Sequence, residues 1–322
     1  SDTVWSASAI TSTLASVTLS GTSSLTIGAN MTISGALTIN AGTFNANNLN
    51  VTAGSLSSSN SSTRAITMGS GTWELTSTGT VWDTATTTGL TLTPNASTVK
   101  LTNNSATGKT FAGGGQIYNN FWFAPSTGTG TLTITGANTF NDFKDDGTGA
   151  HTIVFPAGVN TTIQSLTLDT DSAQLITLQS STPTSYWNLV DTAGTNTVLY
   201  VSITYSCASG GATWDANSAT NFDGGHNCEW AFPGSGIVIS GTVYQTDETT
   251  TLVAKTVHLR VNGTLAGTGA GGTGIEDSDG SGNFSFTTVS VSAGDTITVY
   301  LDGETEDANT ITITDGSTSI TS

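Results

Sequence analysis

Charged residues are scarce in this chain, and positive charges are the scarcest. Only 9% of the 322 residues are charged, with 6 Lys and Arg against 23 Asp and Glu, which gives a formal net charge of −17 at pH 7. So few cations argue against nucleic-acid phosphates or anionic membranes as partners. No apolar run approaches the roughly 20 residues that a membrane-spanning helix needs. We therefore expect no nucleic-acid partner and no membrane insertion.

Helix-forming patterns are also missing. Runs of Ala, Leu, Glu and Lys do not occur, and no window shows a convincing helical period. Thr, Ser, Gly and Asn dominate instead; Thr favours strands, whereas Gly and Asn favour turns. Apolar residues make up 35% of the chain and recur periodically, which excludes a disordered low-complexity chain. The composition predicts an all-β protein.

The most regular stretch lies between residues 25 and 60, where apolar residues recur about every six positions. The recurring positions are Leu25, Met31, Leu37 and Leu49, each followed two places later by Ile27, Ile33, Ile39 and Val51. Residues i and i+2 lie on the same face of a strand, and the small residues between them allow a corner. A short strand and a corner every six residues predict a parallel β-solenoid with three strands per turn.

The period loosens from residue 61, but strand-like segments continue to residue 232. The implied coils grow to roughly 20–30 residues, within the usual range of solenoid repeats. We therefore assign residues 25–232 to the solenoid, and we expect it to be right-handed because the later coils lengthen irregularly.

Residues 1–24 have strand propensity but weak periodicity, which is typical of a cap or of a donor strand. A solenoid exposes an unpaired strand edge at each end, and such an edge is either covered or pairs with a neighbouring molecule. We expect this segment to take part in self-assembly through its apolar side chains. These are Val4, Trp5, Ile10, Leu14 and Val17.

Residues 233–236 form a predicted linker, after which residues 237–322 change to cleanly alternating strands. Hairpin turns are indicated by Asn262-Gly263, Asp279-Gly280 and Asp302-Gly303. The pattern predicts five strands, whereas seven are usual in a β-sandwich of the immunoglobulin type. We expect a small, incomplete sandwich whose missing strand comes from another subunit, with the N-terminal segment as the obvious donor.

Two segments resemble known modules. The phrases TGANTFNDF and TIVFPAGVNTTIQSLTL, with the segment that follows to residue 232, resemble the C-terminal coils of parallel β-helix surface proteins of environmental bacteria and phages. The phrases ISGTVY, KTVHLRVNG, DSDGSGNFSF and AGDTITVYLDG resemble a carboxypeptidase-regulatory or transthyretin-like β-sandwich module, of the kind found along surface adhesins. These resemblances imply an architecture and a surface location, and they imply no activity.

Cys207 and Cys228 are the only two cysteines. An isolated pair in a secreted chain usually forms a disulfide, and a loop of about 20 residues closed in this way is stabilised by roughly 3 kcal/mol. The alternative is a Cys-His-Cys metal site with His226, for which no fourth ligand is evident. The chain begins with Ser1, as a secreted protein does after removal of its signal peptide. We expect a secreted, extracellular protein at the cell surface.

An acidic cluster invites a glycosidase interpretation, because β-helix polysaccharide hydrolases use clustered carboxylates as acid and base. The cluster comprises Asn141, Asp142, Asp145, Asp146 and His151. The Gly-His-Gly and Arg-x-Lys motifs of those hydrolases are absent. A charged corner between coils at residues 144–147 is therefore favoured, and we expect no enzyme and no catalytic residue.

The segment EDSDGSGN has oxygen-bearing side chains at alternating positions, as calcium loops do. These are Asp277, Asp279, Ser281 and Asn283. No glutamate occupies the twelfth position of an EF-hand loop, so a turn before a strand is favoured over calcium. Apart from this calcium candidate we expect no cofactor.

Together, these patterns predict an extracellular structural protein that assembles with copies of itself into a surface filament. The alternative is a glycan-binding adhesin or phage tail-fibre protein, in which exposed aromatic rings stack on sugars. The candidate rings are Trp82, Trp122 and Trp214. A polysaccharide-degrading enzyme is the least favoured interpretation.

Overall fold

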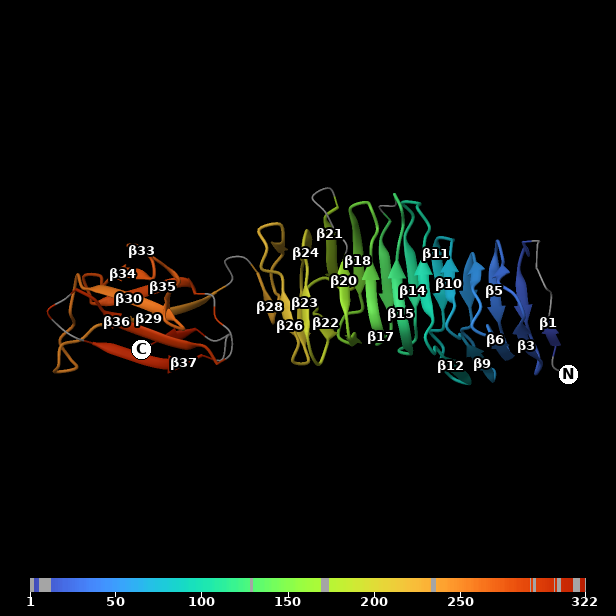
Figure 1. Cartoon of the computed structure of the whole chain (residues 1–322), viewed down its shortest axis with the longest axis horizontal. Helices are drawn as coiled ribbons and strands as arrows, with labels where there is room; N and C mark the ends of the chain where they lie inside the picture. The colour runs from blue at the N-terminus through green and yellow to red at the C-terminus, as the bar shows by residue number, and fades with distance from the viewer. Residues whose placement is uncertain are drawn as a thin grey trace. The chain divides into compact units, whose positions relative to one another are not determined.

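The computed structural model describes residues 3–5, 13–127, 130–168, 174–232, 236–289, 291, 294–303, 305, 308–314 and 319–321. These residues form strands, turns and loops, with no helix among them, as the composition predicts. The chain divides into two compact units, Ser1–Phe232 and Pro233–Ser322. The division falls where the predicted linker begins (Figure 1).

The first unit is a parallel β-solenoid of about nine turns (Figure 1). In its early coils each turn contributes one strand to each of three sheets, beginning with β3 (Ser24–Ile27), β4 (Met31–Thr32) and β5 (Ala36–Ile39). Ser24 pairs with Thr43 and Leu37 with Leu56, in each case 19 residues later. Three consecutive hexads of the sequence therefore occupy three different sheets, which confirms the predicted triangular coil. The right-handed sense stays a prediction.

Strands of successive coils build three sheets, one of five strands and two of ten, and in the second sheet both β19 and β20 pair with β17. The first sheet holds β1 (Thr3–Trp5), β3, β6 (Gly42–Asn45), β9 (Arg64–Thr67) and β12 (Leu90–Thr93). The second holds β4, β7 (Val51–Ala53), β10 (Thr72–Leu75), β13 (Thr98–Leu101), β15 (Ile117–Phe123), β17 (Thr139–Asp145), β19 (Asn160–Thr162), β20 (Leu166–Leu168), β22 (Trp187–Val190) and β25 (Ser206–Ser209). The third holds β2 (Val17–Leu19), β5, β8 (Ser55–Ser57), β11 (Gly79–Asp83), β14 (Lys109–Ala112), β16 (Leu132–Thr135), β18 (His151–Phe155), β21 (Ile176–Ser180), β24 (Val201–Ile203) and β27 (Phe222–Asp223).

Later coils are longer and differ in outline. Gly79 pairs with Lys109, 30 residues later, and Asn160 pairs with Asn188, 28 residues later. The first sheet ends at β12 among the described residues, and a short sheet of β23 (Thr195–Thr197), β26 (Thr213–Asp215) and β28 (Trp230–Ala231) forms near the end of the unit. The loosened period of the sequence thus corresponds to longer corners between strands that stay in register.

A column of aromatic rings fills the middle of the solenoid. Trp73, Trp82 and Phe111 are fully buried and lie in consecutive ring contact, with centroids 6.0 Å and 5.7 Å apart. Burial of each such side chain contributes about 1.5–3 kcal/mol. In β15 Phe121 and Phe123 point inward while Trp122 stays partly exposed, as strand alternation predicts.

The N-terminal segment forms the first coil of this solenoid. Strand β1 pairs with β3, β2 pairs with β5, and Leu14 makes a single bridge to Ile33. Of the residues predicted to mediate self-assembly, Leu14 and Val17 pack at the edge of the core. Ile10 and the side chains of Val4 and Trp5 lie outside the described residues.

The second unit is a curled half-barrel, a shape compatible with the predicted sandwich. Its strands are β29 (Ile237–Thr242), β30 (Thr256–Val261), β31 (Thr264–Leu265), β32 (Thr268–Gly269), β33 (Gly272–Thr273), β34 (Ile275–Asp277), β35 (Asn283–Val289), β36 (Thr296–Leu301), β37 (Asn309–Ile313) and β38 (Ile320–Thr321). The five strands expected from the sequence are β29, β30, β35, β36 and β37. Sequence patterns missed the others because each has only two or three residues. The predicted Asn262-Gly263 turn is confirmed, and both residues have positive φ.

Candidate functional site

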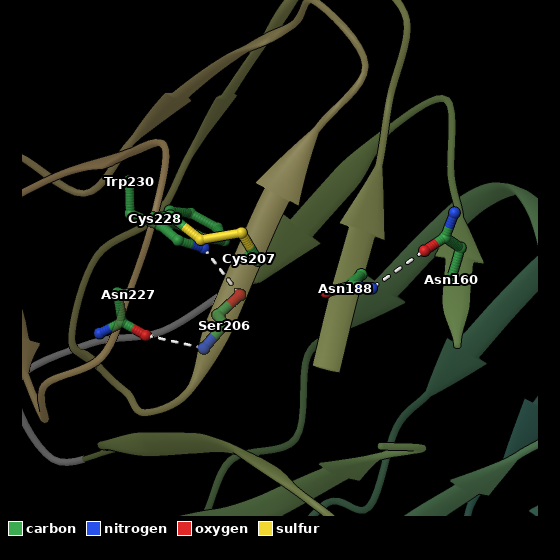
Figure 2. The surroundings of a disulfide bond; sticks show 7 residues. All are labelled: Asn160, Asn188, Ser206, Cys207, Asn227, Cys228 and Trp230. Atoms are coloured by element: carbon green, nitrogen blue, oxygen red, sulfur yellow. Dashed lines mark hydrogen bonds between the residues drawn. A yellow bond between two sulfur atoms is a disulfide. The ribbon is translucent and has the colours of Figure 1, made fainter. Parts of the chain in front are cut away.

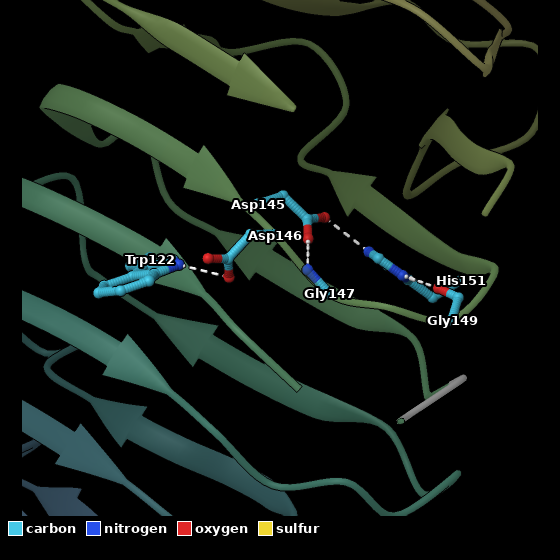
Figure 3. A network of polar contacts seen from close by, with 6 residues as sticks. All are labelled: Trp122, Asp145, Asp146, Gly147, Gly149 and His151. Carbon is cyan, nitrogen blue, oxygen red and sulfur yellow. Dashed lines mark hydrogen bonds and ion pairs between the residues drawn. The ribbon is translucent and has the colours of Figure 1, made fainter. Parts of the chain in front are cut away.

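The acidic corner after β17 contains a buried ion pair. The side chains of Asp145 and His151 are both fully buried, and His151 Nε2 lies 2.6 Å from Asp145 Oδ2. Asp145 Oδ1 accepts a hydrogen bond of 2.9 Å from the Gly147 amide, and His151 Nδ1 lies 2.6 Å from the Gly149 carbonyl oxygen (Figure 3). The contacts of the Asp145 carboxylate and the His151 imidazole thus hold the short loop between β17 and β18.

The surroundings of His151 favour its charged form. Burial alone lowers the pKa of an imidazole, but the hydrogen bond and the charge of Asp145, with the Gly149 carbonyl, outweigh burial and raise the pKa of His151. Both ring nitrogens face acceptors, so only the doubly protonated ring donates to both. This pair therefore stabilises the corner as a buried imidazolium–carboxylate contact.

Lys109 is a second buried cation near this corner. Its side chain lies inside the solenoid, and its Nζ donates to the Ser105 carbonyl oxygen. Burial lowers the pKa of Lys109, and its charge opposes that of His151. A Cβ added at Gly130 would lie 2.9 Å from Lys109 Nζ, so glycine leaves the room that the ammonium group occupies.

Asp146 points away from Asp145, to the surface. It forms an ion pair of 3.3 Å with Lys144 and accepts a hydrogen bond of 2.6 Å from Trp122 Nε1 (Figure 3). Glycoside hydrolysis needs two carboxyl groups that flank one glycosidic bond. Here one carboxylate is buried in an ion pair and the other is held at the surface, which supports the charged-corner interpretation.

Trp122 lies between two lysines. Lys100 Nζ is 3.7 Å and Lys144 Nζ 4.6 Å from the centroid of its ring. The two lysines come from β13 and β17, the strands on either side of β15, and they align with Trp122 in the register. Cation–π contacts with this chain's own ammonium groups therefore occupy the ring where a sugar would stack.

The expectation that Trp82 and Trp214 are exposed is wrong. Trp82 is fully buried, and Trp214 is 2% exposed and packs on Trp230. A shift of register in β11 turns both Val81 and Trp82 inward, so simple alternation fails there. Neither ring is a sugar platform in this fold.

The calcium candidates lie in the turn between β34 and β35, and this turn is not the predicted hairpin because these two strands pair with other strands. Asp279 Oδ1 accepts hydrogen bonds from the amides of Ser281 and Asn283, which lower the pKa of Asp279. Asp277 accepts a hydrogen bond of 3.0 Å from Thr256 Oγ1. Among the residues that the structure describes, no three His, Cys, Asp or Glu side chains gather at a metal-binding distance. The turn accounts for this pattern, as the sequence favoured, and calcium stays the untested alternative.

The predicted disulfide between Cys207 and Cys228 is confirmed (Figure 2). The two cysteines pair in parallel on adjacent coils, at the outward register position that Asn188 occupies one coil earlier. There the Asn188 side-chain amide donates to Asn160 Oδ1 at 3.0 Å. A covalent bond thus replaces an amide hydrogen bond between coils and ties the last coil to the one before it.

The Cys-His-Cys metal alternative is wrong. The two sulfurs bond to each other, and His226 is exposed and stacks on Tyr205 with ring centroids 4.4 Å apart.

Sequence reasoning missed the buried cations. Arg64 is 1% exposed, and its guanidinium donates to the carbonyl oxygens of Ser58, Ser62, Thr86 and Thr88 in two corner loops. A signal was present, because Arg64 and Lys109 each stand two residues before an apolar residue of the same strand. This is the inward-facing register position.

No protein-family profile, curated protein or solved structure matches the chain. The resemblances to surface β-helices and to sandwich modules therefore stay predictions. Among the described residues, no helix has the length and apolarity required to cross a membrane.

The buried ion pair predicts pH-dependent stability. Because the pKa of His151 is raised by folding, its stabilisation is fully present below the unfolded pKa of about 6.5 and is lost as pH rises through the folded pKa. We expect His151→Gln to lower the free energy of unfolding by about 3–5 kcal/mol at pH 5, and by less at pH 9. Urea unfolding of the unchanged protein and of the variant, from pH 5 to pH 9, checks this expectation. The matched control is the exposed His226→Gln, and an equal loss at both pH values would contradict the charged imidazole.

The disulfide predicts a local effect at the end of the solenoid. Reduction, or a Cys207→Ser/Cys228→Ser variant, should reduce stability by about 3 kcal/mol for this 21-residue separation. The last coil should lose most of its protection against hydrogen exchange, because among the described residues it has a partner coil on one side only. Hydrogen exchange should quicken in residues 206–231 and stay unchanged in residues 24–57. Equal loss in both regions would show that the bond acts on the whole unit.

Proposed function

We propose that this protein is a structural subunit of an extracellular filament that assembles by pairing strands between copies. The observation that carries the proposal is the first coil. Among the described residues β1 pairs only with β3 and β2 only with β5, so no described strand pairs with the other edge of either one. Unpaired N–H and C=O groups on such an edge are a template for another strand.

The chemistry of the solenoid supports a scaffold. The carboxylate and imidazole of the acidic corner are buried in a pair, and Asp146 is held by Trp122 and Lys144. Each such contact satisfies a charged group within the fold and leaves none of them free for a substrate. The expectation that the protein is not an enzyme stays a prediction that agrees with this burial.

An extracellular location agrees with the disulfide. Structural disulfides persist in oxidising compartments and are rare in the cytosol. The bond between Cys207 and Cys228 lies near the end of the solenoid, where fraying would otherwise begin. A filament exposed outside the cell would benefit from that protection.

Glycan binding by an adhesin or a phage tail fibre is the second candidate. The observation in its favour is that Trp122, unlike Trp82 and Trp214, reaches the surface. The lysines over its ring count against stacking, so we place this function below assembly. Loss of binding on a glycan array in Trp122→Ala would favour it.

Negative-stain electron microscopy of the protein isolated without denaturant tests the proposal. We expect filaments with a regular axial repeat, because head-to-tail contacts that do not close generate filaments. We expect deletion of residues 1–20 to leave monomers, since it removes β1 and β2, the strands proposed to pair with the next copy. Dispersed monomers or closed trimers of the intact protein would reject the filament. Filaments that persist unchanged after the deletion would reject a joint at the first coil.

A further inference from the structure

A second free edge lies in the C-terminal unit. Strand β37 is the last strand of its sheet and pairs only with β36 among the described residues. Two of its five residues, Ile311 and Ile313, are 64% and 70% exposed. Exposed apolar residues on an edge strand are unusual, because natural proteins protect such edges with charges or prolines.

These isoleucines face away from the core of their own unit. In the register with β36, Thr312 lies opposite Ile297, which is 1% exposed and belongs to the core. Residues on either side of Thr312 point to the opposite face. Ile311 and Ile313 therefore form an apolar pair, at positions i and i+2, on the outer face of an unpaired strand.

The first coil of the solenoid lacks an apolar cover of the kind that β37 offers. Val17 and Leu19 in β2 are also an i, i+2 pair, and they stack on Leu37 and Ile39 of β5. Leu37 and Ile39 are fully buried, whereas Val17 and Leu19 are only partly buried. One more strand, bearing two apolar side chains at this spacing, would complete the interior row.

The distribution of charge selects this pairing over pairing of β37 with itself. Strand β37 is uncharged, but acidic residues precede it at positions 302–307 and follow it at Asp315. Two β37 strands side by side would bring these acids together, and like charges repel. Residues 1–73 contain a single acid, Asp2, so the first coil accepts the acidic flanks with little of this repulsion.

We propose that β37 of one copy adds to the free edge of β2 in a second copy, and that Ile311 and Ile313 cover Val17 and Leu19. This inference rests on the proposed filament function and names its joint. The first coil and Phe232 are at opposite ends of the solenoid, about nine turns apart, so we assign the two edges to different copies. The contact is heterologous and repeats from copy to copy.

Two full-length variants test the joint by complementation. An edge variant, Ile311→Lys/Ile313→Lys, puts charges on β37; a coil variant, Val17→Asp/Leu19→Asp, puts acids on the first coil. Each should be monomeric in light scattering after size exclusion, under conditions where the unchanged protein polymerises. An equimolar mixture retains one intact edge and one intact coil, so it should form a dimer and nothing larger. The matched control Ile117→Lys changes an isoleucine in β15 that is equally exposed, at 64%, and should polymerise normally.

The outcomes separate this inference from the proposed function. If the unchanged protein forms no filaments, the proposed function fails. If it polymerises and both variants do so equally well, the filament stands and this joint is wrong. Variants that are monomeric alone and do not dimerise when mixed would also reject the pairing, as would a dimer formed by the coil variant alone. Circular dichroism and hydrogen exchange of residues 24–232 establish that each variant is folded.

Discussion

The in-register parallel pairing of successive coils is the constraint on which the rest of this structure depends. Each coil has backbone groups and an apolar inner face that only its neighbours along the axis can satisfy. Leu37 shows the result, because it is fully buried between the coils before and after it. Val17, at the same position of the first coil, has a neighbour on one side and is only partly buried. The same interaction that stabilises the interior therefore leaves its ends incomplete.

Buried charge in this solenoid is accommodated at the corners rather than excluded. Arg64 donates to carbonyl oxygens of two corner loops, and His151 pairs with Asp145 across the loop between two strands. Corner loops have carbonyl groups that no neighbouring strand satisfies, so a buried cation supplies the donors that these groups lack. Lys and Arg are few in the chain, and two of the four in the solenoid, Arg64 and Lys109, have buried side chains. Because the chain has so few cations, their placement in the interior indicates that the corner loops must be held rigidly.

Much of the fold was predictable from the sequence, and the failures have local causes. The hexads from Leu25 predicted the three-stranded coil because pairs such as Leu25/Ile27 and Leu37/Ile39 each mark one strand with one inner face, whereas of the pair Leu49/Val51 only Val51 lies in a strand. Alternation also placed Phe121, Trp122 and Phe123 correctly. It failed at Trp82 because a shift of register, set by pairing with neighbouring coils, turns two successive residues inward. The contact between Asp145 and His151 depends on how the five-residue loop between β17 and β18 folds, which spacing alone does not define.

The asymmetry of charge along the chain bears on the proposed assembly. A first coil whose one charged side chain is Asp2 repels an acidic C-terminal unit little, whereas two acidic units repel each other. Contacts between unlike ends propagate, and contacts between like ends close a dimer. A chain with a strongly negative net charge would ordinarily stay monomeric in solution. Asp2 is the one acidic residue before Glu74, so the proposed joint would bring a strongly acidic end against an end with almost no acids and would meet little of that barrier.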